Sequence, residues 1–313
     1  MVAKQAHSAS TICGVTVGAV TVTFQPDFEK LARQCEALDA QLQWVLVDNG
    51  SSASDLAFIE GLIARRGNTR LILNPLNAGL AAAVNQGVAI LDSEFVLLLD
   101  QDTEPQEGSI KALVEGFLQL ECTGKNVACV GPMLLDEDTG GSHGFHQMKK
   151  GMWVRAYPGD DDPSPVPCTN LNGSGTLVRA SYFRELAGLA EPLFIDHVDT
   201  DWSFRVLRQG GLLFGLPRAR FVHSMGEEGI RFWLLGWRVW PKRSPARHYY
   251  LFRNTVWLLK AGHVPAVWKF WAVIKMMLTA TVCGVFDPRR AEHLKRMGKG
   301  LWHGVAGRMG REP

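Results

Sequence analysis

Between residues 15 and 120, short β-prone apolar runs alternate with segments of helical spacing, and this alternation restricts the fold more than any other feature. The expected strands are 15–24, 43–48, 69–73 and 95–99, and the expected helices are 27–40, 54–66, 78–91 and 107–120. Strands that alternate with helices form right-handed crossovers and a mostly parallel, doubly wound sheet. Because such sheets bind ligands at the carboxyl ends of their strands, we expect the chemistry at Asp48, 74–77 and 100–102.

The second half of the chain is less regular. Residues 136–167 are rich in Gly, Asp, Pro and His, which predicts a long loop or hairpin near the site. We then expect a strand at 174–179, a helix that begins near Val198 and a pair of strands around 212–222. From Ile230 onward, Trp, Arg and Lys recur with helical spacing.

Charge is divided unevenly along the chain. The 313 residues are 46% hydrophobic with a mean hydropathy of −0.01, which excludes collagen-like, disordered and polytopic membrane proteins. Residues 231–313 contain 16 Lys+Arg, 3 Asp+Glu and seven of the ten tryptophans, so their net charge is +13 while that of residues 1–230 is −11. A basic segment of this kind indicates an anionic partner, either a membrane or a nucleic acid.

The six cysteines predict neither disulfides nor a zinc site. They show no CxxC spacing and no clustering with histidine along the sequence, which is typical of buried, reduced thiols in a cytosolic protein. Residues 5–26 lack Asp, Glu, Lys and Arg, but their valines are interleaved with Thr and Gly. We therefore expect a buried first strand there and not an export signal.

The sharpest motif is an apolar strand that ends in Asp100-Gln101-Asp102. Residues two apart in extended backbone point to the same side, and two carboxylates at one strand end suit Mg²⁺ or Mn²⁺ bound together with a diphosphate. A later strand ends in His223, and an imidazole on the same ion would favour Mn²⁺. Taken alone, each motif also fits a solvated turn or a structural histidine.

Two further motifs lie near the other strand ends. Asp48 can accept the N3–H of a pyrimidine base, or it can simply stabilise a turn. Asn77 and Gly79 precede an Ala-rich helix whose N-terminus can hold a phosphate or merely be capped.

Acidic residues crowd the beginning of the helix near Val198. Asp196, Asp199 and Asp201 lie within six residues, which is more than capping requires, so one of them can act as a general base. Asp201 and Arg205 also fit an ordinary i,i+4 helix pair.

In this order the motifs resemble those of one family. VTVTFQP, WVLVDNGSS, NxGxAxAxNxG at 77–87, LLLDQD, NGSGTLVR, FIDHVDTDW and FVHSMGE are similar to the motifs of inverting GT-A glycosyltransferases of family 2. The chain most resembles the bacterial rhamnosyltransferases that use dTDP-L-rhamnose, which also have segments similar to RHYYLFRN (247–254) and GLWHGVAGRMG (300–310). Seven motifs in sequence are far more specific than any one.

The resemblance implies an α/β fold of the Rossmann-like GT-A type and a division of the chain. Residues 1–230 would form the catalytic domain, with a nucleotide-sugar half at 1–135 and an acceptor half at 136–230. Residues 231–313 would form an amphipathic helical region that associates with a membrane or mediates oligomerisation.

The resemblance also implies roles for single residues. Asp48 would contact the base with Thr23 nearby, Asn77 and Gly79 would lie along the nucleotide, and Asp100 would approach the ribose and the metal. Asp102 and His223 would bind the metal ion, Mn²⁺ or Mg²⁺. Asp199 matches the catalytic base, because that acid stands two residues before a second acid and shortly before an aromatic residue and an arginine. The candidate sugar contacts are Gly173, Ser174, Asp196, Asp201, Trp202 and Arg205, and Asp196 also competes with Asp199 as the base.

The implied reaction transfers L-rhamnose from dTDP-L-rhamnose to an acceptor hydroxyl. Asp199 would remove the hydroxyl proton while a divalent ion neutralises charge on the leaving dTDP. One base without a nucleophilic partner means a single displacement with inversion. The implied acceptor is a cell-surface glycan on undecaprenyl diphosphate, which places the protein in the cytoplasm, peripherally on the inner face of the plasma membrane.

The basic C-terminal segment allows two interpretations. Lys269 and Lys275 leave an uncharged run of only 11 residues, 276–286, whereas a membrane span needs about 20 apolar residues. Trp and Phe mixed with Lys and Arg favour a helix in the headgroup plane of an anionic membrane. The alternative is a helical subdomain that packs on the catalytic domain or on a second copy. We expect no nucleic-acid partner, because no motif for one is present.

Three alternative functions stay open. The donor can be UDP-galactofuranose or a UDP-hexosamine, because the nucleotide-facing motifs do not identify the sugar. A nucleotidyltransferase would share the sheet and the acids but needs a Gly-rich, basic triphosphate loop, which VTVTFQPDFEK lacks. A non-catalytic membrane adaptor would leave Asp102, Asp199 and His223 unexplained.

Overall fold

The computed structural model describes residues 11–159, 162–223, 229–233 and 237–313. The strands of the first half are β1 (Thr11–Ile12), β2 (Val15–Thr23), β3 (Gln43–Asp48), β4 (Thr69–Leu73), β5 (Phe95–Asp100), β6 (Thr103–Pro105) and β7 (Val127–Asp136). Those of the second half are β8 (Phe145–Lys149), β9 (Met152–Ala156), β10 (Val166–Cys168), β11 (Leu177–Arg179), β12 (Leu212–His223), β13 (Ile230–Trp233) and β14 (Trp237–Trp240). The helices are α1 (Phe28–Ala37), α2 (Ala53–Ile63), α3 (Leu80–Ala89), α4 (Ser109–Cys122), α5 (Ala180–Glu185), α6 (Val198–Arg208), α7 (Pro245–Lys260), α8 (Ala266–Phe286) and α9 (Arg290–Ala306), with a 3₁₀ turn, η1, at Glu191–Leu193.

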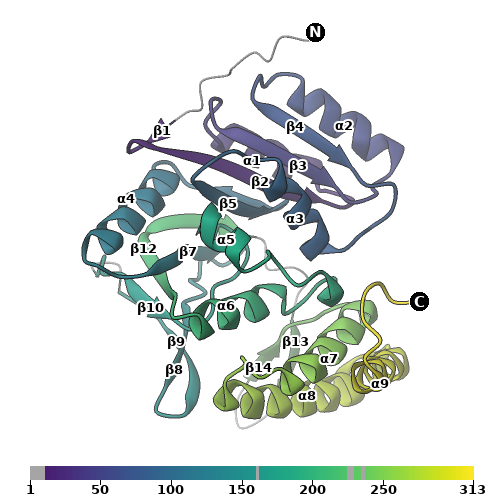
Figure 1. The fold of residues 1–313 in the computed structure, drawn as a ribbon. Coiled ribbons are helices and arrows are strands. Elements are labelled where there is room, and N and C mark those ends of the chain that lie inside the picture. Colours follow the sequence, from purple (N-terminus) through teal and green to yellow (C-terminus); the bar gives the residue numbers. More distant parts are fainter. Residues whose placement is uncertain (1–10, 160–161, 224–228, 234–236) are drawn as a thin grey trace.

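The centre of the molecule is a ten-stranded mixed sheet (Figure 1). Its strands run in the order β10-β12-β7-β11-β5-β2-β3-β4, with β1 beside β2 and β6 beside β12. Strands β5, β2, β3 and β4 are parallel, whereas β11 is antiparallel to both of its neighbours. The predicted α/β class with a mostly parallel N-terminal half is thus confirmed.

Alternate residues of each strand pack against opposite helical layers. In β3, Trp44 and Leu46 join the core that includes α1, α2 and α4. Val45 and Val47 join the other core, which includes α3, α5 and α6. Because side chains alternate across a strand, a strand stretch buried on both faces must be apolar, as residues 44–47 (WVLV) are.

The parallel register brings three strand ends to one edge of the sheet. Thr23 at the end of β2 pairs with Asp48 at the end of β3, and Val22 pairs with Asp100 at the end of β5. The residues that follow these strands therefore share the edge where ligands of such sheets bind.

Two sequence-based expectations in the second half need correction, whereas the hairpin expected within 136–167 is confirmed. Residues 212–222 form one strand, β12, parallel to β7, because a bulge between Leu216 and Arg220 absorbs the break in its apolar pattern. The 136–167 segment contains the β8–β9 hairpin and the strand β10. The strand expected at 174–179 is only Leu177–Arg179.

The sequence predicts helical structure from Ile230 onward, but this region is not helical throughout. It begins with the β13–β14 hairpin, in which Ile230 pairs with Trp240, and only then continues into α7, α8 and α9 (Figure 1). Aromatic and β-branched residues favour strands as strongly as helical spacing favours a helix, so the two patterns compete in this short segment.

Helix α8 is longer than the uncharged run that the sequence displays. Its 21 residues, Ala266–Phe286, have a mean hydropathy of 1.4 and satisfy the length and composition of a membrane span, with 22% of the stretch buried. This length includes Lys269 and Lys275, so the helix meets the length of a span only with two charges inside it, and its peripheral position stays a prediction.

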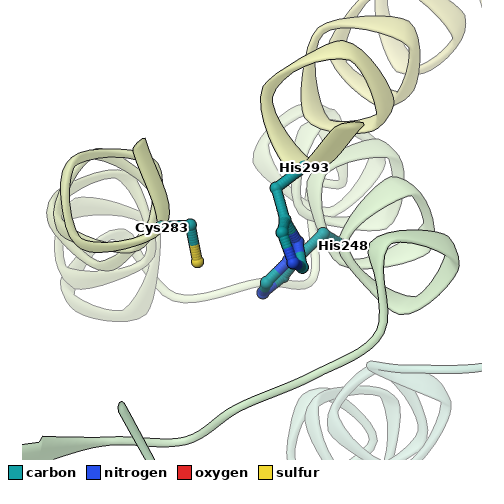
Figure 2. Close-up of side chains that lie close together, drawn as sticks. All are labelled: His248, Cys283 and His293. Carbon is teal, nitrogen blue, oxygen red and sulfur yellow. The ribbon is translucent and has the colours of Figure 1, made fainter. Parts of the chain in front are cut away.

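Helices α7, α8 and α9 are joined by a buried polar cluster of His248, Cys283 and His293 (Figure 2). These residues are far apart in sequence, so the expectation that no cysteine clusters with histidine fails in space. The Nδ1 atoms of the two histidines are 2.7 Å apart, and His293 Nε2 lies 3.3 Å from Asp287 Oδ2. Two nitrogen ligands of one tetrahedral ion would be about 3.3 Å apart, so the two Nδ1 atoms are placed for a hydrogen bond to each other and not to share an ion. Burial lowers the pKa of His248 to about 4, which keeps it neutral.

Candidate active site

Two acids and one histidine converge at the sheet edge. Asp100 ends β5, Asp102 lies two residues later, and His223 ends β12. One possible ligand atom from each residue lies within 4.8 Å of the other two. His223 Nδ1 is 3.4 Å from Asp102 Oδ1 and 3.1 Å from Thr103 Oγ1. Burial lowers the pKa of His223, but Asp102 and Asp100 raise it more. Two carboxylates and an imidazole that converge in this way fit a divalent ion such as Mn²⁺.

Buried polar groups hold the turn that carries both acids. The amide of Gln34, fully buried in α1, donates to the carbonyls of Asp100 at 2.7 Å and Thr103 at 2.5 Å. Ser174 Oγ donates to Asp100 Oδ2. Ser174, predicted to contact a sugar, instead orients an acid of the cluster, and the preceding Gly173 has no atom within 4 Å of the place where a Cβ would lie.

Asp199 lies in the first turn of α6 and is partly buried. Its Oδ1 accepts a hydrogen bond from the backbone N–H of Thr200 at 2.8 Å. Burial, with repulsion from Asp100 and Asp196, raises the pKa of Asp199 to about 6, against the lowering effect of that hydrogen bond. A carboxylate of this pKa is ionised at neutral pH and basic enough to accept a proton.

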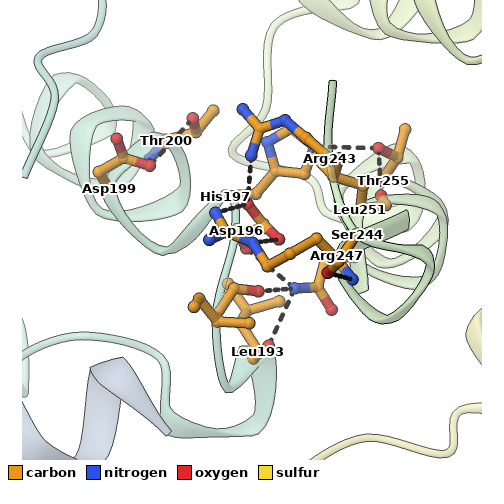
Figure 3. A network of polar contacts seen from close by, with 12 residues as sticks. Leu193, Asp196, His197, Asp199, Thr200, Arg243, Ser244, Arg247, Leu251 and Thr255 are labelled. Atoms are coloured by element: carbon orange, nitrogen blue, oxygen red, sulfur yellow. Dashed lines mark hydrogen bonds and ion pairs between the residues drawn. The ribbon is translucent and has the colours of Figure 1, made fainter. Parts of the chain in front are cut away.

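Asp196 is occupied by two arginines (Figure 3). Its carboxylate, 5% exposed, accepts hydrogen bonds from Arg247 at 2.7 and 2.8 Å and from Arg243 at 3.2 Å. Burial raises the pKa of Asp196, but the two arginines lower it by a larger amount, so the net shift is downward. A carboxylate that is fully paired and less basic than usual is a poor general base.

The loop that carries these acids is strained and is held in place by α7. Phe194, Asp196 and His197 all have φ between 61° and 65°, which costs on the order of 1–3 kcal/mol per residue. The amide of Asn254 donates to the carbonyls of Leu193, Ile195 and Asp196 at 2.8–2.9 Å. The fully buried Arg253 also donates to the carbonyl of Leu193 at 2.9 Å. The C-terminal helices thus fix the position of Asp199 as well as forming a surface.

Asp48 and Thr23 are buried and bonded to each other. Thr23 Oγ1 donates to Asp48 Oδ1 at 3.1 Å, and the N–H groups of Gly50 and Ser51 donate to Oδ2 at 3.1 and 2.9 Å. Asp48 is 1% exposed. Asp48 therefore stabilises the turn after β3, and its contact with a base stays a prediction.

The N-terminus of α3 is capped by protein and not open to a phosphate. The N–H of Leu80 donates to the Phe194 carbonyl at 2.7 Å, and that of Gly79 donates to Asn77 Oδ1 at 2.9 Å. Gly79 has φ +93°, and a Cβ there would lie 2.6 Å from the Phe194 ring. Asn77 and Gly79 therefore position the 194–199 loop, and their contact with the nucleotide stays a prediction.

Three predicted sugar contacts point away from the site. Asp201 is fully buried and binds Arg205 Nε and His263 Nε2, each at 2.8 Å. Arg205 also donates to the carbonyls of residues 186 and 188, so three of its five N–H donors bind protein. Trp202 is 4% exposed and packs on Phe183 in the core. The first two turns of α6 thus present Asp199 to the site and Asp201, Trp202 and Arg205 to the interior.

Sequence reasoning missed Arg243 and Arg247. Arg247 is electrostatically coupled to Asp196, Asp100 and Asp199, which together raise its pKa against the lowering effect of burial. The motif RHYYLFRN, which contains Arg247 and Asn254, was the available signal, but nothing local connects it with a loop 50 residues earlier. Of the motif FVHSMGE, residues 224–227 lie outside the described residues.

The fold and the acidic strand-end cluster define the class of GT-A glycosyltransferases. Residues 24–186 match the glycosyl transferase family 2, which is more than half of the chain. The protein belongs to this family and is a glycosyltransferase.

Curated relatives cover most of the chain at modest identity. The dTDP-rhamnosyl transferase RfbF of Shigella flexneri is 27% identical over 284 residues, 89% of this chain and 91% of its own length. The N-acetylglucosaminyl-diphospho-decaprenol L-rhamnosyltransferase of Mycobacterium tuberculosis is 26% identical over 282 residues, 81% of this chain and 86% of its own.

Solved structures share the fold at lower identity. GalNAc-T7 with UDP, GalNAc and Mn²⁺ has a TM-score of 0.59 and 17% identity over 93% of this chain, which spans 56% of that protein. The mannosyltransferase PcManGT of Pyrobaculum calidifontis, with GDP-Man and Mn²⁺, has a TM-score of 0.54 and 12% identity over 93% of this chain and 75% of its own.

Proposed function

We propose that the protein is an inverting, metal-dependent rhamnosyltransferase that transfers L-rhamnose from dTDP-L-rhamnose to a hydroxyl of a lipid-linked glycan. The observation that carries the mechanism is the convergence of Asp100, Asp102 and His223 beside Asp199, within a family 2 fold. The names of the Shigella and Mycobacterium relatives support the donor and the lipid-diphosphate acceptor.

The residues present fit a divalent ion. Asp102 and His223, with Asp100, would hold it through oxygen and nitrogen donors, and two structural neighbours of the same fold contain Mn²⁺. Such an ion supplies charge neutralisation at the diphosphate leaving group. Ser174 and Gln34 hold Asp100 in place before the donor enters.

Asp199 is the proposed base. It accepts the proton of the acceptor hydroxyl as that oxygen attacks the anomeric carbon, and the bond from this carbon to the diphosphate breaks in the same step. Asp196 anchors Arg247 beside the site, where this guanidinium adds positive charge near the donor diphosphate. Because no second carboxylate is placed as a nucleophile among the described residues, one displacement inverts the configuration.

We further propose that helices α8 and α9 rest on the cytoplasmic face of an anionic membrane. Helix α8 exposes a stripe formed by Phe270, Val273, Met277 and Val285, and α9 exposes Trp302 and Val305. Apolar stripes of this spacing within a segment of net charge +13 suit the headgroup plane. A peripheral position would bring the site to a lipid-bound acceptor.

Donor hydrolysis tests the proposed donor. Purified protein is incubated with Mn²⁺ and, separately, dTDP-L-rhamnose, UDP-galactofuranose, UDP-N-acetylglucosamine and UDP-N-acetylgalactosamine, and released sugar is measured. We expect rhamnose release well above the other sugars, and its loss with EDTA or in the Asp102→Asn variant. Release from a UDP-sugar alone would overturn the donor assignment in favour of the alternative donors.

A further inference from the structure

An apolar recess lies between the β8–β9 hairpin and helices α7 and α8, beside the loop that carries Asp199. It encloses about 290 Å³, close to the lower end of the volumes of small-molecule sites, roughly 300–1,000 Å³. Its walls include four tryptophans, Trp153 on β9, Trp240 on β14, and Trp268 and Trp271 on α8. We call it the tryptophan recess.

The recess adjoins the proposed base. His197, two residues before Asp199, lines it. The His197 ring meets Trp268 edge-on at 5.4 Å, and its Nε2 lies 3.1 Å from Thr255 Oγ1. A molecule seated in the recess with its polar end toward His197 would therefore place that end near Asp199.

One cation lines the recess and two more lie close to it. Lys275 lines the recess, and Arg155 and Arg243 lie near enough to lower its pKa, after the larger effect of burial. In the described part of the chain, neither Lys275 nor Arg155 forms an ion pair with a carboxylate. Arg243 shares Asp196 with Arg247. Three cations with one shared carboxylate make an unbalanced positive site, which favours a multiply charged anion.

An apolar recess with a positive rim fits one kind of molecule, an apolar chain that ends in a diphosphate. We propose that the tryptophan recess binds the first isoprene units of a polyprenyl diphosphate acceptor and that Lys275, Arg155 and Arg243 hold its diphosphate. The inference rests on the proposed function, because it assigns a place to the lipid part of the proposed acceptor. The opposite face of α8, with Phe270 and Met277, remains free for the membrane.

Isothermal titration with farnesyl diphosphate, below its micellar concentration, tests the proposal on the full chain. Ala272→Trp fills the recess, Lys275→Gln removes one rim charge, and Met277→Trp is the control on the opposite face of α8. We expect binding to weaken at least tenfold in Ala272→Trp and about fivefold in Lys275→Gln, and to be unchanged in Met277→Trp. Farnesol and inorganic diphosphate should each bind at least tenfold more weakly than farnesyl diphosphate.

Several results would overturn the recess proposal. Equal affinity of the wild type, Ala272→Trp and Lys275→Gln would do so, as would equal binding of inorganic diphosphate, which would indicate only an anion site. A dimer that Ala272→Trp dissociates, without loss of farnesyl diphosphate binding, would show that a second copy fills the recess. Circular dichroism and donor hydrolysis identify variants that fail to fold. A wild type that binds farnesyl diphosphate but does not hydrolyse dTDP-rhamnose would contradict the proposed donor and leave the recess intact.

Discussion

Asp199 and Asp196 are three residues apart, yet their surroundings give them opposite properties. Asp196 is bound by two arginines, which lower its pKa, whereas burial raises that of Asp199 to about 6. In many enzymes, two neighbouring acids lie in environments that push their pKa values apart, and the acid with the raised pKa transfers the proton. The same difference predicts opposite effects of removing the two charges.

We predict that Asp199→Asn lowers kcat by about 10²–10⁴-fold, the usual contribution of a general base, and leaves the donor Kd within about threefold. Because the folded pKa exceeds the unfolded one, the carboxylate destabilises the protein as pH rises from about 4 through 6. In metal-free protein at pH 7.5, the Asp199→Asn substitution should therefore raise the free energy of unfolding. We expect an increase of about 1 kcal/mol, which is less than the full pKa shift implies because the side chain is partly exposed.

Asp196→Asn is the matched comparison. It removes the charge of a buried carboxylate from two arginines that are 39% and 41% exposed, so we expect a loss of about 1–2 kcal/mol in stability. Thermal unfolding and single-turnover kinetics of both variants provide the measurements. Normal turnover by the Asp199→Asn variant would show that Asp199 is not the base.

The pH dependence follows from the same pKa. A general base acts when deprotonated, so kcat/KM should be constant above about pH 7 and fall about tenfold per pH unit below about 6. The assay uses a saturating metal concentration at each pH, because protonation of His223 would also weaken metal binding. A profile that stays flat down to pH 5 would rule out a base with this pKa.

At the residue scale, sequence predicted which residues converge at the sheet edge better than which way the side chains of α6 point. Asp100, Asp102 and His223 lie at predicted strand ends, where a side chain's direction follows from strand alternation. The helix α6 was also expected, but whether Asp201 and Trp202 face the site or the core depends on how that helix rests on the sheet. That rotation is set by distant partners such as His263 and Phe183, which no local pattern reveals.

Among the elements, the contact between α3 and the strained loop is the most sensitive. Gly79 precedes α3 with φ +93°, and a Cβ would meet the Phe194 ring and carbonyl at 2.6–2.8 Å. Gly108 precedes α4 with φ +73° and has no atom within 4 Å of such a Cβ. Gly79, with ψ 157°, lies in a region that essentially only glycine adopts, whereas Gly108, with ψ −8°, is left-handed helical. Only Gly79 has the close contact.

We predict that Gly108→Ala costs about 1 kcal/mol of stability and leaves kcat unchanged, because it adds only the strain of a left-handed alanine. Gly79→Ala should cost about 2–4 kcal/mol and lower kcat at least tenfold, since displacement of the Phe194 loop also moves Asp199. Denaturant unfolding and steady-state kinetics test the pair. Equal effects of the two substitutions would show that the contact with Phe194 does not position the site.

Sequence reasoning found almost all elements of the N-terminal half, because strands buried on both faces appear as continuous runs of apolar residues. It failed at Ile230–Trp240, where aromatic and basic residues suit a strand as well as a helix. It also left α7 without a role. The contacts of Arg253 and Asn254 with the 192–196 loop join residues about 60 positions apart, and only the fold brings them together.

At the scale of the whole molecule, the basic C-terminal region has two faces with different tasks. Its interior side fixes the catalytic loop through α7, and its exterior side exposes the apolar stripe of α8. The opposite net charges of residues 1–230 and 231–313 are consistent with an acidic catalytic half that requires a metal and a basic half that meets anionic lipid.

We predict that the protein floats with phosphatidylglycerol-containing liposomes at about 0.1 M salt, and less at 1 M, where the Debye length is about 3 Å. Met277→Glu, on the exposed stripe of α8, should reduce flotation several-fold. Ile90→Glu, at an exposed apolar position far from α8, should not. Absence of flotation by the wild type at moderate salt would refute the membrane proposal.

The anomeric configuration of the product tests the central claim most directly. Rhamnose is transferred from dTDP-L-rhamnose to a lipid-diphosphate acceptor in the presence of Mn²⁺, and the new glycosidic bond is examined by NMR. We predict a configuration opposite to that of the donor, formed by the wild type and not by Asp199→Asn. A product that keeps the donor's configuration, or one that Asp199→Asn forms at the normal rate, would contradict a single displacement with Asp199 as the base.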